Sequence, residues 1–337
     1  MRVPQPRRFL IPWAVALFTR LGQSDVLAIA HTFGLGIVQD VQSIAAGTIN
    51  SNFDLRTDRG RWFVRINEGK AEADVAWEAQ LVAALASGGV VTPGPLTAQD
   101  GAPYAALPGT RKYVSVFPWR AGHHLAARAI SPDDAAQFGA ALAQLHRVGL
   151  ALPPAWRRRS IYDHDHLVAR YAGFSQARDP ELAHAIAVIG AGLAAGAAAA
   201  AVRARATQGI IHGDLFRDNV LWDHGRVVAI LDFEQASGGS LAYDLAVCIN
   251  DWCWDDGLRR EVAAGLLAGY QQVRPLTAGD REALLVEVPA AAIRFTITRI
   301  TDVYLAKVDN PDKDFRAFLA RCDAWQGEAL GELGALL

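Results

Sequence analysis

The stretch His212-Gly213-Asp214-Leu215-Phe216-Arg217-Asp218-Asn219, followed by Ile230-Leu231-Asp232-Phe233-Glu234, decides the interpretation of this chain. Asp214 is followed by an asparagine five positions later and, after an intervening segment, by a second aspartate. A carboxylate can accept the proton of an attacking hydroxyl, while an amide oxygen and a second carboxylate can hold Mg²⁺ against the phosphates of ATP. The pattern therefore predicts phosphoryl transfer to an alcohol, with Asp214 as the base and Asn219 and Asp232 as metal ligands.

The flanking residues favour a strand, a loop and a hairpin around these three side chains. Residues 209–211 form one predicted strand, and residues 219–222 and 227–231 form two more, joined by the turn Asp223-His224-Gly225. The hairpin would carry Asn219 at its start and Asp232 at its end, so both could converge beside Asp214. Single Asp and Asn residues in turns usually only cap backbone groups, but the whole ordered set in this context favours catalysis.

Composition limits the class of protein. The 337 residues carry a net charge of −2, with 51% hydrophobic and 20% charged residues, so the chain can bury a core, and neither nucleic acid nor a membrane is an expected partner. Cys248, Cys253 and Cys322 lack metal-ligand spacing and are expected to be reduced thiols. Residues 7–20 are basic and then apolar but lack a clear signal-peptide cleavage site. We expect a cytoplasmic protein whose oligomeric state is open.

Three regions are predicted along the chain: an N-terminal helical extension over residues 1–36 with Ser24-Asp25 as its cap, an ATP-binding lobe over 37–120, and a catalytic and substrate-binding lobe over 121–337. The first lobe should hold antiparallel strands at 37–45, 49–57, 62–67 and 113–119 and a helix at 71–87. Helices of the second lobe are predicted at 131–146, 164–174, 180–207, 241–253, 257–272, 280–307 and 312–334. The expected fold class is α+β, a two-lobed protein-kinase-like fold with a mostly helical second lobe.

Candidate ATP-binding residues lie in the first lobe. The small, polar segment 45–52 could cover the phosphates through Gly47, Ser51 and Asn52. Arg65 takes the place of the usual third-strand lysine, with Glu78 as its expected partner and Glu72 as the alternative. An extended segment should offer its backbone to adenine at Ser115, Val116 and Phe117.

The motifs H-G-D-x-x-x-x-N and L-D-F, with Leu241-Ala242-Tyr243-Asp244, resemble the aminoglycoside phosphotransferase-like superfamily, which phosphorylates small alcohols with MgATP. Residues 50–53, 211–220, 241–253, 269–276 and 293–299 are similar to its homoserine kinase branch, and the resemblance runs from about residue 20 to 310. It implies the roles given above for the base and the metal ligands, a structural role for His212, and a buried acid bracing the catalytic loop at Asp244. The chain departs from the branch at Gly213, Glu234 and Asp251.

The acceptor that the resemblance implies is L-homoserine, phosphorylated to O-phospho-L-homoserine in threonine biosynthesis. Its carboxylate requires an arginine and its ammonium an acid, both near Asp214. The candidates are Asn250, Asp251, Trp252, Arg294, Arg299 and Asp302. Structural alternatives exist, because Arg299 and Asp302 could form an i,i+3 surface pair and Trp252 could be an ordinary core residue.

Two alternatives to this function stay open. Another acceptor within the same superfamily is possible: an amino alcohol, a sugar or an aminoglycoside. The protein could also be a pseudokinase that serves as a binding module, although the complete set of base and metal ligands argues against it. The exact acceptor, feedback regulation, the replacement of the ATP-site lysine by Arg65 and the roles of Glu234 and Asp251 are also open.

Overall fold

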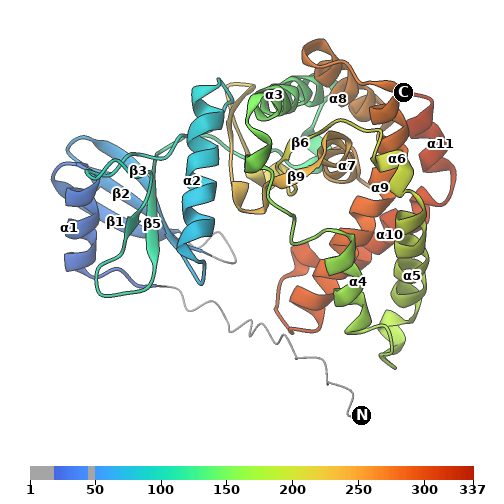
Figure 1. Cartoon of the computed structure of the whole chain (residues 1–337), viewed down its shortest axis with the longest axis horizontal. Helices are drawn as coiled ribbons and strands as arrows, with labels where there is room; N and C mark the ends of the chain where they lie inside the picture. The colour runs from blue at the N-terminus through green and yellow to red at the C-terminus, as the bar shows by residue number, and fades with distance from the viewer. Residues whose placement is uncertain (1–18, 45–49) are drawn as a thin grey trace. The chain divides into compact units, whose positions relative to one another are not determined.

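A computed structural model describes residues 19–44 and 50–337 of the chain. The chain divides into two compact units, Met1–Ala83 with Gly94–Trp119 and Ala84–Pro93 with Arg120–Leu337, each described by itself below (Figure 1). The α+β class and the protein-kinase-like fold predicted from the sequence are confirmed. The division into three regions stays a prediction, and Gly47 lies outside the described residues.

The first unit is a five-stranded antiparallel sheet in the order β1-β2-β3-β5-β4, with helices α1 and α2 on its two sides (Figure 1). The predicted antiparallel set is thereby confirmed. Its elements are α1 (Gln23–Thr32), β1 (Val38–Ile44), β2 (Ser51–Thr57), β3 (Gly60–Asn67), α2 (Glu72–Ser87), β4 (Ala105–Ala106) and β5 (Tyr113–Pro118).

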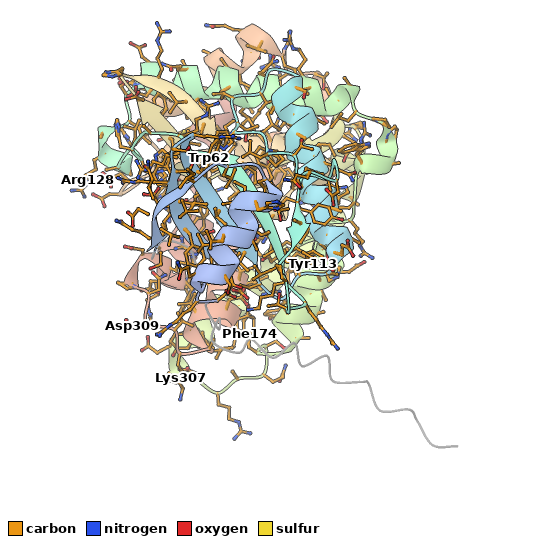
Figure 2. The ribbon with its side chains drawn as sticks, turned by 90° about the vertical axis from the view of Figure 1, so that its left-hand side faces the viewer. Trp62, Tyr113, Arg128, Phe174, Lys307 and Asp309 are labelled. Atoms are coloured by element: carbon orange, nitrogen blue, oxygen red, sulfur yellow. The ribbon has the colours of Figure 1, made fainter. Side chains whose placement is uncertain are left out.

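Alternation along β3 divides its side chains between the two faces of the sheet. Val64 and Ile66 are buried in one hydrophobic cluster with Val26 and Ile29 of α1. The intervening Arg65 contacts α2 instead, through the hydrogen bond described below. Figure 2 shows α1 lying across the sheet, with Trp62 and Tyr113 labelled toward opposite ends of the paired strands.

The start of α1 differs from the prediction. The helix begins after Gly22, whose backbone N–H donates to the Asp25 carboxylate at 2.8 Å. Ser24-Asp25 therefore lie inside the first turn, and the expected cap was wrong by two positions. Asp25, the third residue of the helix, accepts this N–H from within the first turn, whereas Gly22 has no side chain that could accept a bond in return. The cap residue alone therefore does not reveal the helix start.

The second unit is mostly helical, with two small antiparallel pairs of strands (Figure 1). Its helices are α3 (Pro132–Ala151), α4 (His164–Ala172), α5 (Ala183–Ala198), α6 (Ala200–Arg203), α7 (Leu241–Trp252), α8 (Arg260–Val273), α9 (Ala278–Arg299), α10 (Phe315–Trp325) and α11 (Glu328–Gly334). The predicted helix start at Ser131-Pro132 is confirmed, because the Ser131 hydroxyl accepts the Asp134 N–H at 3.1 Å.

Helices α3 and α8 pack so closely that glycines form their interface. A Cβ atom at Gly269 would lie 1.8 Å from the carbonyl oxygen of Ala136, and one at Gly139 would lie 2.2 Å from that of Leu266. Both distances are far below van der Waals contact. The two backbones can approach each other only because neither position carries a side chain.

The strands of the second unit are β6 (Gln208–Ile211) paired with β9 (Ser237–Ser240), and β7 (Val220–Asp223) paired with β8 (Arg226–Ile230). The strand before the motif and the hairpin after it were both predicted. Strand β9 was not predicted, because its sequence Ser-Gly-Gly-Ser has low β propensity and pairs only where β6 supplies a partner.

Three predicted helices are shorter or interrupted. The helix expected at 280–307 ends at Arg299 and continues as a π-helix over Ile300–Tyr304, and the one expected at 312–334 is divided by Gly327 into α10 and α11. The helix expected at 180–207 consists of a 3₁₀ turn (Pro180–Leu182), α5 and α6. Apolar periodicity persists across such interruptions, so it does not locate them.

In the described chain, one helical stretch, Pro180–Ala198, is long and apolar enough to cross a membrane by length and composition alone. A close contact ties this stretch to α9, because a Cβ at Gly192 would lie 2.6 Å from Ile293. A single stretch of this kind is weak evidence for a membrane span.

Candidate active site

The loop after β6 turns sharply before Asp214. Gly213 has a positive φ of 79°, and a Cβ there would lie 3.0 Å from the carbonyl oxygen of Gln235. A side chain at this position would be strained for both reasons. The glycine that departs from the homoserine kinase branch therefore suits the backbone of this chain.

A buried carboxylate holds the start of this loop. Asp244 on α7 accepts the backbone N–H of His212 at 2.7 Å and that of Gly213 at 2.8 Å. It also lies 3.0 Å from the ring of His146. Burial acts to raise the pKa of Asp244, but the hydrogen bond and charge of His146 together with the loop contacts outweigh it and lower that pKa. These contacts support the bracing role expected of Asp244.

Beyond Asp244, three other residues of α7 contact the rest of the loop that follows β6. Trp252 donates from Nε1 to the carbonyl oxygen of Leu215 at 3.2 Å, and the Cys248 thiol lies 3.7 Å from the same oxygen. Asp251 accepts the Arg217 backbone N–H at 2.8 Å and its side-chain Nε at 3.0 Å. Positions four, seven and eight residues apart share a helix face, so the loop follows one face of α7.

The two predicted metal ligands are held beside each other by the hairpin. Asn219 donates from Nδ2 to the carbonyl oxygen of Asp214 at 2.7 Å, which directs its Oδ1 away from that bond. The Leu231 N–H donates to the Asn219 carbonyl at 2.8 Å, and the His212 ring lies 2.8 Å from the Leu231 carbonyl. Asp232 follows with a left-handed backbone, φ 61°, a conformation that costs energy and is found at functional sites.

Asp214 itself is paired with a buried arginine. Arg294 on α9 donates from an Nη atom to Asp214 Oδ1 at 3.0 Å, and its side chain is only 3% exposed against 31% for Asp214. The guanidinium carbon lies 3.8 Å from the ring centre of Phe295 and 4.2 Å from that of Tyr162. In the described part of the chain Asp214 Oδ2 has no such partner, so the carboxylate of this predicted base has one oxygen that Arg294 orients and one that remains available.

The other substrate candidates do not gather in one place. Asn250 is fully buried, donating to the carbonyls of Ala246 and Val288 and accepting from Trp325. The Trp252 ring is also fully buried and stacks on Phe138 at 3.9 Å between ring centres. These two side chains support the fold around the site, as does Asp251 through Arg217.

Arg299 and Asp302 do not form the surface pair considered above. Asp302 lies in the π-helix and accepts from Arg170 on α4 at 2.7 Å. Arg299 donates to the carbonyl oxygen of Asp314 at 3.0 Å. The π-helix changes the register after Arg299, so the helical i,i+3 geometry assumed for the pair does not apply.

In the first unit Arg65 pairs with Glu78, the preferred partner, at 2.9 Å, and not with Glu72. The same Glu78 carboxylate also accepts from Lys70 at 3.0 Å. Lys70 was not considered from the sequence, because it lies outside β3. Two cations of this unit, Arg65 and Lys70, therefore share the Glu78 carboxylate, and their side chains are 12% and 18% exposed.

Some of the other candidate ATP-binding residues already form hydrogen bonds within the first unit. The Ser51 hydroxyl donates to Glu68 at 2.7 Å, and Asn52 lies opposite Arg65 in the pairing of β2 with β3. The remaining candidates belong to β5, which pairs with β3 on one side and β4 on the other: Ser115, Val116 and Phe117. The Leu96 N–H, from the segment between α2 and β4, donates to the Val116 carbonyl at 2.7 Å, so that oxygen already has a partner within the unit.

This fold, with two carboxylates and an amide on one loop and hairpin, is typical of kinase-like phosphotransferases. The chain belongs to the phosphotransferase enzyme family, whose model matches residues 40–276. It is 34% identical over 303 residues to a homoserine kinase of Gluconacetobacter diazotrophicus, covering 86% of this chain and 89% of the relative. A homoserine kinase of Parvibaculum lavamentivorans is 29% identical over 94% of this chain and 97% of the relative.

Solved structures share the fold at low identity. An amicoumacin kinase in complex with AMP-PNP and Ca²⁺ has a TM-score of 0.69 at 14% identity, covering 92% of this chain and 94% of that one. A choline/ethanolamine kinase family protein from Mesorhizobium loti has a TM-score of 0.65 at 20% identity, covering 93% and 98%. The protein is thus an ATP-dependent phosphotransferase that acts on a small molecule.

Proposed function

We propose that this protein phosphorylates the hydroxyl of L-homoserine with ATP and Mg²⁺. The observation that carries the chemistry is Asp214, which Arg294 orients through Oδ1 and whose Oδ2 stays available, next to Asn219 and Asp232. The relatives named homoserine kinase, which match most of the chain, support the acceptor. We further infer that the enzyme acts in the cytoplasm, as part of threonine biosynthesis.

Asp214 acts as the general base. Its Oδ2 accepts the proton of the acceptor hydroxyl while the hydroxyl oxygen attacks the terminal phosphorus of ATP. The bond from that phosphorus to the bridging oxygen breaks, and ADP leaves with the electron pair. The protein forms no covalent bond to the substrate in this mechanism. Its main contribution is to hold Asp214 in a fixed position through the loop after β6 and Arg294.

The residues of the hairpin fit a magnesium ion. Asn219 and Asp232 supply a neutral and a charged oxygen, the ligand type that Mg²⁺ prefers, and the Nδ2 bond of Asn219 leaves its Oδ1 for a metal. When bound, the ion neutralises phosphate charge. His212 and Leu231 keep the two ligands in register.

Nucleotide recognition in the first unit falls to its cations and small polar residues. Arg65 and Lys70, both held by Glu78, supply positive charge for phosphate oxygens. Ser51 and Asn52 at the start of β2 are expected to add hydrogen bonds, as is the backbone of Gly47. The peptide groups of β5 near Phe117 are expected to face adenine.

The test is an ADP-release assay with homoserine, serine, which is one methylene shorter, threonine, choline, a hexose and kanamycin as acceptors. We expect the highest kcat/KM with homoserine and weak turnover of alcohols that differ by one methylene, which changes transition-state binding by only about 1–3 kcal/mol. A higher kcat/KM with choline or kanamycin would show that homoserine is not the preferred acceptor, but it would leave the proposed phosphoryl transfer unchanged. Mg²⁺-dependent ATP binding without turnover of any alcohol would instead support a pseudokinase.

A further inference from the structure

Beside the catalytic loop, the second unit holds five arginines and three phenylalanines. Arg294 lies against Phe295, and Arg299 and Arg321 lie against Phe318. Arg170 lies over Tyr162, a ring that Arg294 also contacts. The Phe216, Phe295 and Phe318 rings contact one another, with centres 4.5 Å apart for the first two and 5.0 Å apart for the last two. Arg170 belongs to α4, Arg217 to the 3₁₀ turn Arg217–Asn219, Arg294 and Arg299 both to α9, and Arg321 to α10. Such a concentration of positive charge requires counter-ions.

Three of these arginines have carboxylate partners. Arg170 pairs with Asp302 at 2.7 Å, Arg217 with Asp251 at 3.0 Å, and Arg294 with Asp214 at 3.0 Å. Each guanidinium is thereby neutralised within the protein, as is usual for a buried charge.

The remaining two, Arg299 and Arg321, have no carboxylate within 4 Å in the described part of the chain. Each donates one bond to a backbone carbonyl, Arg299 to Asp314 and Arg321 to Ala317. Both guanidinium carbons lie 4.4 Å from the ring centre of Phe318. A guanidinium has five N–H groups, so most donors of this pair are left for another acceptor.

Burial and neighbouring positive charges favour the binding of an anion by Arg299 and Arg321. The Nε of Arg321 is buried and makes no hydrogen bond within the described residues. Burial lowers the pKa of Arg321 to about 10, and the neighbouring Arg299 and Arg217 add to this against Asp251. Burial also lowers the pKa of Arg299, with Arg294 adding to it while Asp251, Asp314 and Asp214 oppose it. Two partly desolvated cations that repel each other are stabilised by a shared anion.

We propose that Arg299 and Arg321, lying against Phe318, form an anion subsite that binds the α-carboxylate of the amino-acid acceptor. The inference rests on the proposed function and deepens it, by naming the group that distinguishes this acceptor from a simple amino alcohol. The contacts from Arg294 to Phe295 at 3.8 Å, from Phe295 to Phe318 at 5.0 Å and from Phe318 to Arg299 at 4.4 Å connect the base with the subsite.

Arg294 is assigned a different role from Arg299. Its side chain is buried to 97% between Tyr162 and Phe295 and is committed to Asp214, so it positions the base. Arg299 is partly exposed and carries no such commitment. The planar fork of an arginine also matches a carboxylate better than a lysine does.

The experiment compares homoserine with 3-aminopropan-1-ol, which keeps the alcohol and the amine but lacks the carboxylate. For each enzyme the ratio of the two kcat/KM values is measured in the full-length protein, so any loss of folded enzyme cancels. Arg299→Met should lower the ratio by about 30-fold or more, mainly through KM for homoserine, as expected for lost charged hydrogen bonds. Arg321→Met should act in the same direction, and Arg299→Lys should recover part of the ratio.

The matched control is Arg205→Met, which removes an exposed arginine paired with Glu282 and should leave the ratio unchanged. An unchanged ratio in both Arg299→Met and Arg321→Met, in an enzyme whose wild type phosphorylates homoserine, would overturn the subsite alone. A raised KM for ATP with an unchanged ratio would also overturn it, in favour of phosphate. A wild type that does not phosphorylate homoserine would overturn the proposed function and the subsite together.

Discussion

Asp214 is the proposed general base, so its carboxylate is the first residue to test. The Asp214→Asn variant keeps the shape of the side chain, and Arg294 can still contact its oxygen, but the proton acceptor is lost. We expect kcat to fall by about 10²–10⁴-fold, with the affinity for ATP nearly unchanged. Steady-state kinetics and nucleotide titration measure both quantities. Turnover close to that of the wild type would contradict the assignment of the base.

Asp244 makes the catalytic loop sensitive to acid. Its pKa in the folded protein is lowered, so the stability that it contributes is complete above the unfolded pKa and is lost as pH falls through the folded value. Replacing Asp244 by Asn leaves His146 and two backbone N–H groups poorly paired and should cost about 3–5 kcal/mol at neutral pH. Below about pH 4, where the unfolded carboxyl is protonated, the difference from the wild type should shrink.

Urea unfolding of both proteins from neutral to acidic pH measures this difference. The exposed Asp223→Asn in the same unit is the control and should change the unfolding free energy by less than about 0.5 kcal/mol. A difference that grew as the pH fell would mean that Asp244 has a raised pKa.

At the scale of single residues, the sequence indicated a candidate base and candidate metal ligands, but it did not indicate the residues that pair with them. The proposed base Asp214 and the proposed metal ligands Asn219 and Asp232 lie close together in the sequence, so their spacing carries the signal. The contacts Arg294–Asp214 and His146–Asp244 join residues 80 and 98 positions apart, and no local pattern encodes such a pair. Arg217–Asp251 explains the acid that departs from the homoserine kinase branch, but only the position of α7 beside the loop reveals it.

At the scale of elements, the position of the candidate active site depends on α7, which contacts the loop after β6, and on the packing of α3 against α8. Strand β9 and the division between α10 and α11 were missed because pairing and packing override weak local preferences there. The hairpin of β7 and β8 was predicted because its turn and alternation are local. The glycines of α8 gave no sequence signal that distinguishes close packing from flexibility.

The α3–α8 contact makes Gly269 intolerant of the smallest side chain. Gly269→Ala would place a Cβ 1.8 Å from the Ala136 carbonyl, and backbone on both sides prevents a local adjustment. We expect a loss of about 3 kcal/mol in the free energy of unfolding, at the upper end for overpacking. Denaturant unfolding measures the loss.

Gly331→Ala in α11 is the matched control, since nothing lies within 4 Å of the added carbon. Alanine favours a helix over glycine, so this variant should gain up to about 1 kcal/mol. Equal losses in the two variants would mean that backbone flexibility, and not packing, explains both.

At the scale of the whole molecule, nucleotide binding should be visible as stability. A ligand that binds only the folded state at about 100 times its Kd adds about 2.7 kcal/mol, so a non-hydrolysable ATP analogue should raise Tm, and more so with Mg²⁺. Asp232→Asn keeps a residue type that tolerates the left-handed backbone but removes the ligand charge. The Mg²⁺-dependent part of the Tm shift should disappear in this variant and persist in Asp223→Asn.

The three buried cysteines allow opening of the fold to be measured by chemical modification of their thiols. Cys248, Cys253 and Cys322 are buried, and burial raises the pKa of each thiol, that of Cys322 to about 12. A thiol is alkylated only as an accessible thiolate, so the native chain is protected from such reagents. The rate of alkylation at Cys248 therefore reports how often α7 opens, and a cysteine introduced at the surface can carry a fluorophore without removal of the natural ones.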